Sequence, residues 1–189
     1  HHSASVAVVH NGIIENYQEL RAELTEAGVT FTSDTDTEVI PHLIEQFLSR
    51  GLGPLEAVRG AMARLHGAFA LGILFKGRED LLIAARRGSP LIVGLGEGEN
   101  FMGSDATPLV PYTRRMLYLQ DDDIAVLTRE KVDVVDLAGE PVARPIKTSR
   151  VSADVTEKWP YRHYMQKEIF EQPTAIGETL RDYINHADQ

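Results

Sequence analysis

The sequence predicts an α+β fold, and three observations support this class. Segments with a helical spacing of apolar residues fill most of the chain as far as Leu65. From Ala68 onward, short apolar runs alternate with turns rich in Gly, Pro and Asp, which is typical of hairpins in one or two mostly antiparallel sheets. Helices followed by a block of strands favour α+β over a parallel fold of alternating strands and helices.

The first elements are a strand, a turn and a helix. Ser5–His10 is a β-branched run typical of a buried strand, and we expect a turn where Asn11 and Gly12 follow it. Apolar residues then recur with a helical period from Ile13 to Ala27, and Gly28 is a typical helix stop. A further short strand is expected at Val29–Phe31.

Two more helices are predicted before the strands begin. The stretch "TSDTDTEVI" supplies N-cap candidates for a helix that runs from Val39 to Leu48 and stops at Gly51. Pro41 lies in its first turns, where it removes one hydrogen bond. The spacing of apolar residues predicts a third helix over Pro54–Leu65.

The remainder of the chain is expected to hold seven strands, an extended connection and two closing helices. The connection is "ARPIKTSRVSADVTEKWP", which has no periodicity. The helices are expected at Tyr161–Gln172 and Thr174–Ile184, divided by Pro173. The strand-like runs are "AFALGILF", "DLLIAAR", "LIVGLG", "NFMGS", "MLYLQ", "DIAVLT" and "KVDVVD".

Composition excludes several classes of function. With 19 basic and 28 acidic side chains, the 189-residue chain has a formal charge of −9, which argues against nucleic acid as a partner. No apolar run approaches the roughly 20 residues that span a bilayer, and we expect a cytoplasmic protein without membrane contact. The residues include no cysteine, so disulfides, thiolate metal sites and a cysteine nucleophile are excluded within them.

Three motifs have simple structural interpretations. Gly94–Asn100 lacks the spacing of a dinucleotide-binding loop and is expected to be a hairpin turn. The run Asp121–Asp123 lacks the spacing of a calcium loop and is expected to be a solvated turn. The histidines form no ligand pair with an acidic neighbour, so we expect no metal and no cofactor.

Asn11 and Gly12 allow two interpretations. Asn-Gly after a strand is usually a turn, because both residues tolerate positive φ. A side-chain amide next to an unencumbered backbone N–H is also what a developing oxyanion requires. Asp36 is likewise ambiguous, since an acidic residue at a helix N-terminus is favoured by the helix dipole alone.

A set of motifs in fixed order resembles the glutaminase domain of class II, or N-terminal nucleophile, glutamine amidotransferases. The set begins with "VVHNGIIEN" and "SDTDTEVI". Within that class, "RRGSPLIVGLGEGENF", "PYTRR" and above all "YRHYMQKEIFEQP" are similar to the members that use fructose 6-phosphate as acceptor and make glucosamine 6-phosphate. The resemblance extends from His1 to about Ile184.

The resemblance implies a role for each candidate residue. Asn11 is expected to donate its side-chain amide, and Gly12 its backbone N–H, to the oxyanion formed from the carboxamide of L-glutamine. Asp36 is expected to pair with the α-ammonium group of the substrate. The implied fold is the four-layer αββα sandwich of N-terminal nucleophile hydrolases, without its first strands.

The chain departs from the family in one respect that bears on activity. The nucleophilic N-terminal cysteine of the family, and the strands and substrate-carboxylate loop that follow it, are not among these residues. We therefore expect residues 1–184 to be a partial amidotransferase domain that is inactive alone, and 185–189 to begin the linker to an isomerase domain that binds fructose 6-phosphate. The parent protein is expected to be a homo-oligomer. The alternatives are another class II member, such as an amidophosphoribosyltransferase, or a non-catalytic interaction or regulatory domain with this fold.

Overall fold

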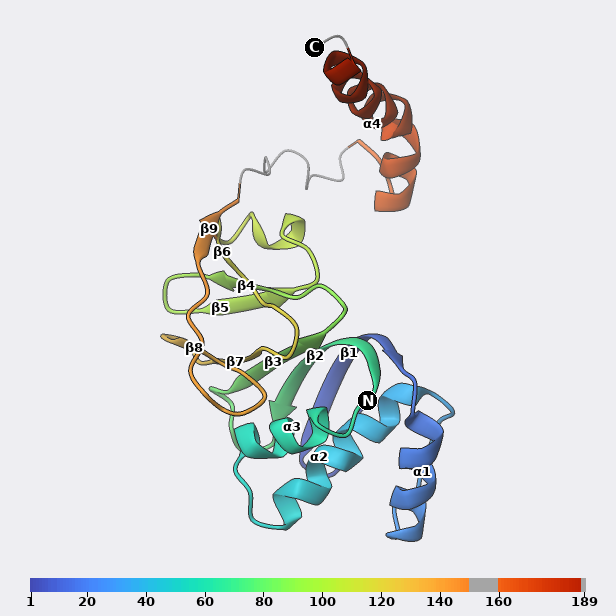
Figure 1. Ribbon diagram of the computed structural model, residues 1–189, viewed down its shortest axis with the longest axis vertical. Helices are drawn as coiled ribbons and strands as arrows, with labels where there is room; N and C mark the ends of the chain where they lie inside the picture. Colours follow the sequence, from blue (N-terminus) through green and yellow to red (C-terminus); the bar gives the residue numbers. More distant parts are fainter. Residues whose placement is uncertain (150–159, 188–189) are drawn as a thin grey trace. The chain divides into compact units, whose positions relative to one another are not determined.

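The computed structural model (Figure 1) describes residues 1–149 and 160–187. The chain divides into two compact units, His1–Val151 and Ser152–Gln189, which are described separately. The first unit combines helices with two antiparallel sheets, which confirms the predicted α+β class.

The larger sheet of the first unit has five strands in the order β1-β2-β3-β7-β8. All of its neighbouring strands are antiparallel, and β1 is its outermost strand on one side. Its strands are β1 (Val6–Ile14), β2 (Gly67–Phe75), β3 (Leu82–Arg87), β7 (Ile124–Leu127) and β8 (Val132–Val135).

The smaller sheet has four strands in the order β5-β4-β6-β9 and packs on one face of the larger sheet (Figure 1). Small side chains such as Ala70 and Ala84 meet Val93 and Leu117 between the sheets, which lets the two backbones approach closely. Its strands are β4 (Ile92–Leu95), β5 (Asn100–Gly103), β6 (Arg115–Tyr118) and β9 (Ile146–Thr148).

Helices cover the other face of the larger sheet (Figure 1). They bury the main core, in which Phe69 and Ile73 of β2 meet Leu43 of α2 and Met62 of α3. The described residues of the first unit thus form three layers, one helical and two of sheet. The helical elements are α1 (Tyr17–Glu26), η1 (Asp36–Glu38), α2 (Val39–Ser49) and α3 (Pro54–Met62), and the short η2 (Thr107–Leu109) lies against the smaller sheet.

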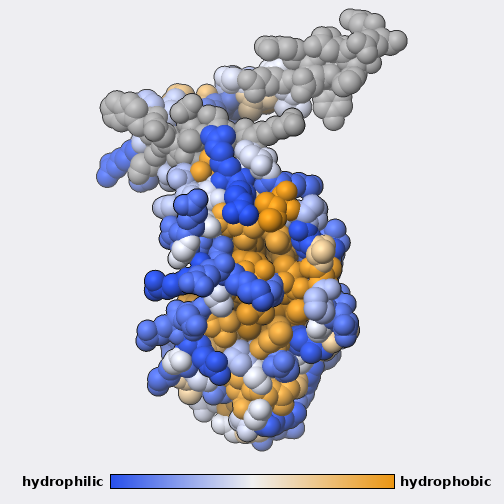
Figure 2. Space-filling view, turned by 90° about the vertical axis from the view of Figure 1, so that its left-hand side faces the viewer, coloured by the Kyte–Doolittle hydropathy of each residue, from blue (hydrophilic) through white to orange (hydrophobic). Residues whose placement is uncertain are grey.

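A hollow between the two sheets opens at the end where β8 and β9 lie. Val132, Val134 and Ile146 contribute to its lining together with Leu95 and Leu117. Figure 2 shows a broad apolar area on this side of the first unit, bordered by hydrophilic side chains.

The turn expected at Asn11 and Gly12 is wrong, because β1 continues through both residues to Ile14. Ile13 and Ile14 fit a helical period and a strand equally well, and the structure uses them to extend the ladder with β2. The first helix accordingly begins at Tyr17 and not at Ile13. It ends before Gly28, which has φ +92° and confirms the predicted stop.

The strand expected at Val29–Phe31 is also wrong. The backbone N–H of Val29 donates to the carbonyl of Leu24 and so closes the end of α1. Phe31 packs edge-on against His42 instead of pairing with another strand. The segment therefore makes its contacts with α1 and α2 and does not pair with a strand.

The other predicted helices and strands of the first unit are confirmed, with small shifts at their ends. α2 contains Pro41 in its first turn, and α3 ends at Met62, three residues earlier than expected. All seven predicted strands form. The hairpin expected at Gly94–Asn100 joins β4 to β5 and is closed by a bond from the Gly96 N–H to the Glu99 carbonyl.

The run Asp121–Asp123 is a turn as predicted, and Asp121 is exposed and Asp122 partly exposed, but the expected solvation is wrong for Asp123. Each carboxylate pairs with an arginine, and Asp123 is only 1% exposed. The pairs are Asp121 with Arg86 at 2.6 Å, Asp122 with Arg87 at 2.7 Å and Asp123 with Arg144 at 2.8 Å. The partners lie far along the chain, so the sequence pattern around the turn does not reveal them.

Two further expectations near the C-terminus are corrected. The stretch expected to be an extended connection contains β9, while its residues 150–159 lie outside the described part of the chain. In the second unit, α4 (Tyr164–Ala187) is one helix with Pro173 inside it, not two helices divided there. None of the helices in the described residues combines the length and apolar character needed to cross a membrane.

Candidate functional site

The outer edge of β1 presents the backbone groups of its even-numbered residues. Lys76 donates its N–H to the Ser5 carbonyl, and Glu15 donates to the His66 carbonyl, so the odd-numbered residues form the hydrogen-bonded pairs with β2. Even-numbered residues must therefore point their N–H groups away from β2. Ile14 confirms this alternation, because its N–H donates to the carboxylate of Asp36 at 2.7 Å.

Part of this edge is covered by the first residues of the chain. His1 exchanges two backbone hydrogen bonds with Val8, and Ser3 donates its N–H to the Val6 carbonyl. Glu45 of α2 holds this short hairpin in place by accepting the hydroxyls of Ser3 and Ser5. The covered part ends before Gly12.

Gly12 lies on the uncovered part of the edge. By the alternation along β1 its N–H points outward, away from the carbonyl groups of β2. Its φ of +125° is a conformation that side chains rarely adopt, and a Cβ there would lie 2.1 Å from the Ala68 carbonyl oxygen. The backbone at this point therefore requires glycine and leaves one N–H free.

Asp36 lies beside the same edge. It begins η1, and its Oδ2 accepts the Ile14 N–H while its Oδ1 lies 3.2 Å from the Thr35 hydroxyl. Two residues of extended strand span about 7 Å, which sets the approximate separation between the Gly12 N–H and the Asp36 carboxylate. A free donor and a carboxylate thus lie side by side along one strand edge.

Asn11 is exposed, and its side-chain amide has no hydrogen-bond partner within the described ranges. Strand alternation places this side chain on the opposite face of β1 from the buried Val8 and Ile14. The three predicted site residues therefore gather at one end of β1, with Asn11 on the face that the smaller sheet covers further along.

Two supporting residues were not identified from the sequence. Nδ1 of His10 lies 2.9 Å from the Thr37 hydroxyl, while its Nε2 is buried without a partner among the described residues. Burial lowers the pKa of His10, and the negative charge of Asp36 opposes this effect only in part. His10 and Thr37 lie in the motifs "VVHNG" and "SDTDTE". The sequence does not show that these two motifs lie side by side, because that depends on the fold.

Glu38 is the second of these residues, and it shapes the loop that carries Asp36. Its carboxylate is 2% exposed and accepts the backbone N–H and hydroxyl of both Thr32 and Ser33, at 2.6–2.8 Å. Burial alone would raise the pKa of Glu38, but these hydrogen bonds outweigh it and lower the pKa to about 2. The loop from Thr32 to Glu38 is therefore folded around a buried anion.

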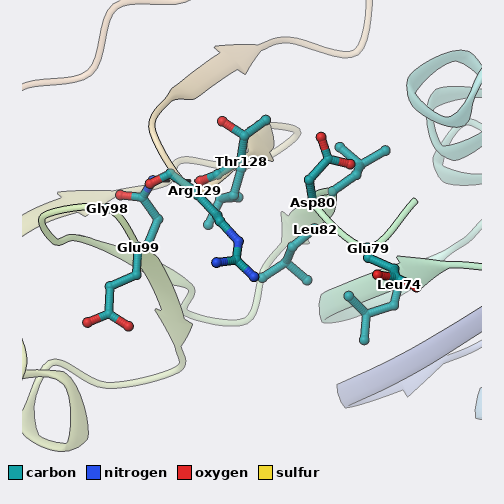
Figure 3. Close-up of a pocket in the computed structure, with 11 residues that line it drawn as sticks. Leu74, Glu79, Asp80, Leu82, Gly98, Glu99, Thr128 and Arg129 are labelled. Carbon is teal, nitrogen blue, oxygen red and sulfur yellow. Dashed lines mark hydrogen bonds between the residues drawn. The ribbon is translucent and has the colours of Figure 1, made fainter. Parts of the chain in front are cut away.

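A separate hollow lies among the hairpin loops (Figure 3). Leu74 and Leu82 form part of its apolar lining, and Glu79, Asp80 and Arg129 supply charge. Its lining includes none of Asn11, Gly12 and Asp36, so it is distinct from the edge of β1.

Comparison with known sequences agrees with the resemblance that the motifs indicate. A family model described as "Glutamine amidotransferase domain" matches residues 1–111. The chain is 52% identical over 184 residues to "Glutamine--fructose-6-phosphate aminotransferase [isomerizing]" of Zymomonas mobilis, covering 97% of this chain and 30% of that protein. The protein of the same name from Brucella abortus is 51% identical over 185 residues, covering 98% of this chain and 30% of that protein. The chain thus spans about 30% of the length of these curated relatives.

Comparison with solved structures supports the fold. The glutamine phosphoribosylpyrophosphate amidotransferase from B. subtilis, complexed with ADP and GMP, has a TM-score of 0.60 and 24% identity, covering 70% of this chain and 29% of that one. A structure titled as the allosteric regulatory enzyme of purine biosynthesis has the same TM-score and identity, covering 71% of this chain and 29% of that one. At this identity the likeness establishes a shared architecture only.

Proposed function

Since the chain belongs to the family of glutamine amidotransferase domains, we propose that it is part of the glutamine-hydrolysing domain of an enzyme that converts fructose 6-phosphate and L-glutamine to glucosamine 6-phosphate and L-glutamate. The names of the relatives at 52% and 51% identity support this acceptor. An amidotransferase with a different acceptor, or a non-catalytic domain of the same fold, is the alternative.

The observation that carries the proposed site is the outer edge of β1, where alternation directs the Gly12 N–H outward and the Asp36 carboxylate is bound two residues further on, at Ile14. An extended glutamine has its carboxamide oxygen and its α-ammonium group at its two ends. The separation of about 7 Å suits a ligand that places the oxygen at Gly12 and the ammonium at Asp36. Asn11 adds a second donor from its side chain next to Gly12.

The chemistry assigned to these residues is electrostatic. When a thiolate attacks the carboxamide carbon, the carbonyl oxygen becomes an oxyanion, which the Asn11 amide and the Gly12 N–H stabilise. The C–N bond then breaks as the nitrogen takes up a proton from water, so that ammonia leaves, and water hydrolyses the resulting thioester to glutamate and releases the thiol. Asp36 forms a charge-assisted bond with the α-ammonium and so selects an amino acid over a simple amide.

The nucleophile in this scheme is a cysteine that these 189 residues do not contain. The chain alone can therefore bind and orient L-glutamine but has no thiolate to attack it. In the proposed full domain, further strands and a second helical layer complete a four-layer αββα sandwich. Residues 1–184 would belong to that domain and 185–189 to the linker towards the fructose 6-phosphate domain of a homo-oligomeric enzyme.

Calorimetric titration of the 189-residue chain tests the binding site. We expect saturable binding of L-glutamine and much weaker binding of glutaramate, which keeps the carboxamide but lacks the α-ammonium group. Equal binding of the two ligands, or binding of neither, would contradict the proposed site.

A second measurement tests the assignment of the missing nucleophile. We expect no glutamate release above the uncatalysed rate from a preparation whose intact mass matches these residues alone. Release of glutamate by such a preparation would show that another residue acts as nucleophile.

A further inference from the structure

His10 and Ile14 attach η1 to β1 at two points, one on each side of Gly12. The Ile14 N–H donates to Asp36, and the His10 ring lies 2.9 Å from the hydroxyl of Thr37, the next residue of η1. Each attachment is two residues from Gly12 along the strand. The position of Asp36 relative to the free N–H thus depends on both.

The direction of the bond between His10 and Thr37 follows from their proton inventories. The Thr37 hydroxyl has one proton, and its oxygen also lies 3.5 Å from Oδ1 of Asp36, which can only accept. If Thr37 donated to His10, the neutral ring would carry its proton on Nε2. That atom is buried without a partner among the described residues, and a buried N–H without an acceptor is rare.

If His10 donates to Thr37 instead, no buried N–H of the ring is left without an acceptor. With its proton on Nδ1, His10 donates to Thr37, and the Thr37 hydroxyl is free to point its proton at the Asp36 carboxylate. The buried Nε2 is then a bare acceptor, which is the less costly group to leave unpaired. Burial lowers the pKa of His10 and thereby favours the neutral ring.

We propose that His10 is a positioning residue that acts through Thr37 to orient the Asp36 carboxylate for the α-ammonium group of an amino-acid substrate. The role given to Asp36 rests on the proposed function. The hydrogen-bond relay from His10 through Thr37 to Asp36 does not, and it has a signature of its own.

The tautomer of His10 provides that signature. In ¹⁵N–¹H correlation spectra of the intact chain at slightly alkaline pH, with His10 assigned through His10→Gln, we expect the proton on Nδ1. The exposed His66 supplies the pattern of an unconstrained ring in the same spectrum. A proton on Nε2 of His10 in the unaltered chain would overturn the relay, whether or not any variant folds.

Variants of Thr37 test the dependence on its hydroxyl. Thr37→Ser keeps the hydroxyl and should preserve the His10 pattern, whereas Thr37→Val should abolish it. Thr25→Val, made at an exposed helical threonine, is the matched control and should leave the pattern unchanged. An unaltered His10 pattern in Thr37→Val would also overturn the relay.

Binding of L-glutamine connects the relay to function. We expect Thr37→Val and His10→Gln to weaken L-glutamine binding about three- to tenfold, and Thr37→Ser and Thr25→Val to leave it unchanged. If the unaltered chain binds no L-glutamine, the proposed function fails while the tautomer still decides the relay. If it binds L-glutamine and Thr37→Val binds equally well, the positioning role fails and the proposed function stands.

Discussion

The backbone N–H of Ile14 donates to the carboxylate of Asp36 at 2.7 Å and joins two segments 22 residues apart. This bond places a negative charge against the outer edge of β1, two residues from the free N–H of Gly12. The edge of the sheet thereby presents a donor and an anion in fixed order, and the charge of Asp36 can distinguish an amino acid from a simple amide.

Asp36→Asn should remove the selectivity of the site and keep its structure. The asparagine oxygen can still accept the Ile14 N–H, but the charge that pairs with an ammonium group is lost. We expect L-glutamine to bind roughly 10- to 100-fold more weakly, at a level similar to glutaramate, when measured by calorimetry. Asp34→Asn, at a fully exposed carboxylate of the same loop, should bind like the unaltered chain. Unchanged discrimination in Asp36→Asn would argue that Asp36 has only a structural role.

Gly12→Ala should destabilise the fold strongly. The new Cβ would lie 2.1 Å from the Ala68 carbonyl oxygen, and φ would have to stay near +125°. Overpacking and backbone strain together predict a loss of about 2–5 kcal/mol in the free energy of unfolding, measured in urea. Gly28→Ala isolates the strain, because φ there is +92° and no atom lies within 4 Å of its Cβ position. Its expected loss is about 1–2 kcal/mol. Equal losses of unfolding free energy in the two variants would show that β1 shifts at Gly12 to make room for the methyl group.

Glu38→Gln should destabilise the protein in a manner that depends on pH. The folded pKa of Glu38 is about 2 and lies below its ordinary value of 4.5, so the ionised carboxylate stabilises the fold above pH 4.5 and loses this effect as the pH falls towards 2. At neutral pH we expect a loss of about 2 kcal/mol in urea unfolding, because four hydrogen bonds to a charged group are weakened. The difference from the unaltered chain should narrow between pH 4.5 and 2. The exposed Glu97→Gln should show no such trend, and a constant difference across this range in Glu38→Gln would contradict the assignment.

Arg144→Met should lower the free energy of unfolding by much more than the position of Arg144 near the surface suggests. Arg144 makes two bonds of 2.8 Å to Asp123, whose buried carboxylate would keep the Gln120 N–H as a donor but lose its only positively charged partner among the described residues. Breaking one side of a buried pair typically costs about 3–5 kcal/mol. Lys131→Met breaks the exposed pair with Asp133 and should cost less than about 1 kcal/mol in the same urea titration. Recovery of part of the loss in the double variant Asp123→Asn with Arg144→Met would assign the cost to the unpaired charge.

Elements with a strong local signal were predictable from the sequence. α2 has a regular apolar stripe, and the strands from β2 to β8 are separated by turn residues whose conformations are set locally. β9 carries no such signal, because Ile146–Thr148 becomes a strand only by pairing with β6, about 30 residues earlier. The error at Asn11 and Gly12 has the same origin, since partners in β2 decide whether the strand continues.

The candidate site was predictable as a set of residues but not as an arrangement. Asn11, Gly12 and Asp36 were identified by resemblance to a family. That Gly12 keeps a free N–H depends on the register between β1 and β2, and that Asp36 lies beside it depends on a bond to Ile14. His10 and Glu38 support the arrangement through contacts that only the folded chain reveals.

The alternation of N–H directions along β1 makes the motif sensitive to chain length as well as to residue type. Deleting one residue between Val6 and His10, with the pairing upstream of it kept, would shift Gly12 to a hydrogen-bonded position. Its N–H would then donate to a carbonyl group of β2. The letters His-Asn-Gly would survive unchanged, and the donor would be lost. A two-residue deletion would restore the direction of the N–H but move it one step along the edge, away from Asp36. Among homologues, gaps within this strand should therefore mark chains that keep the motif and have lost the site.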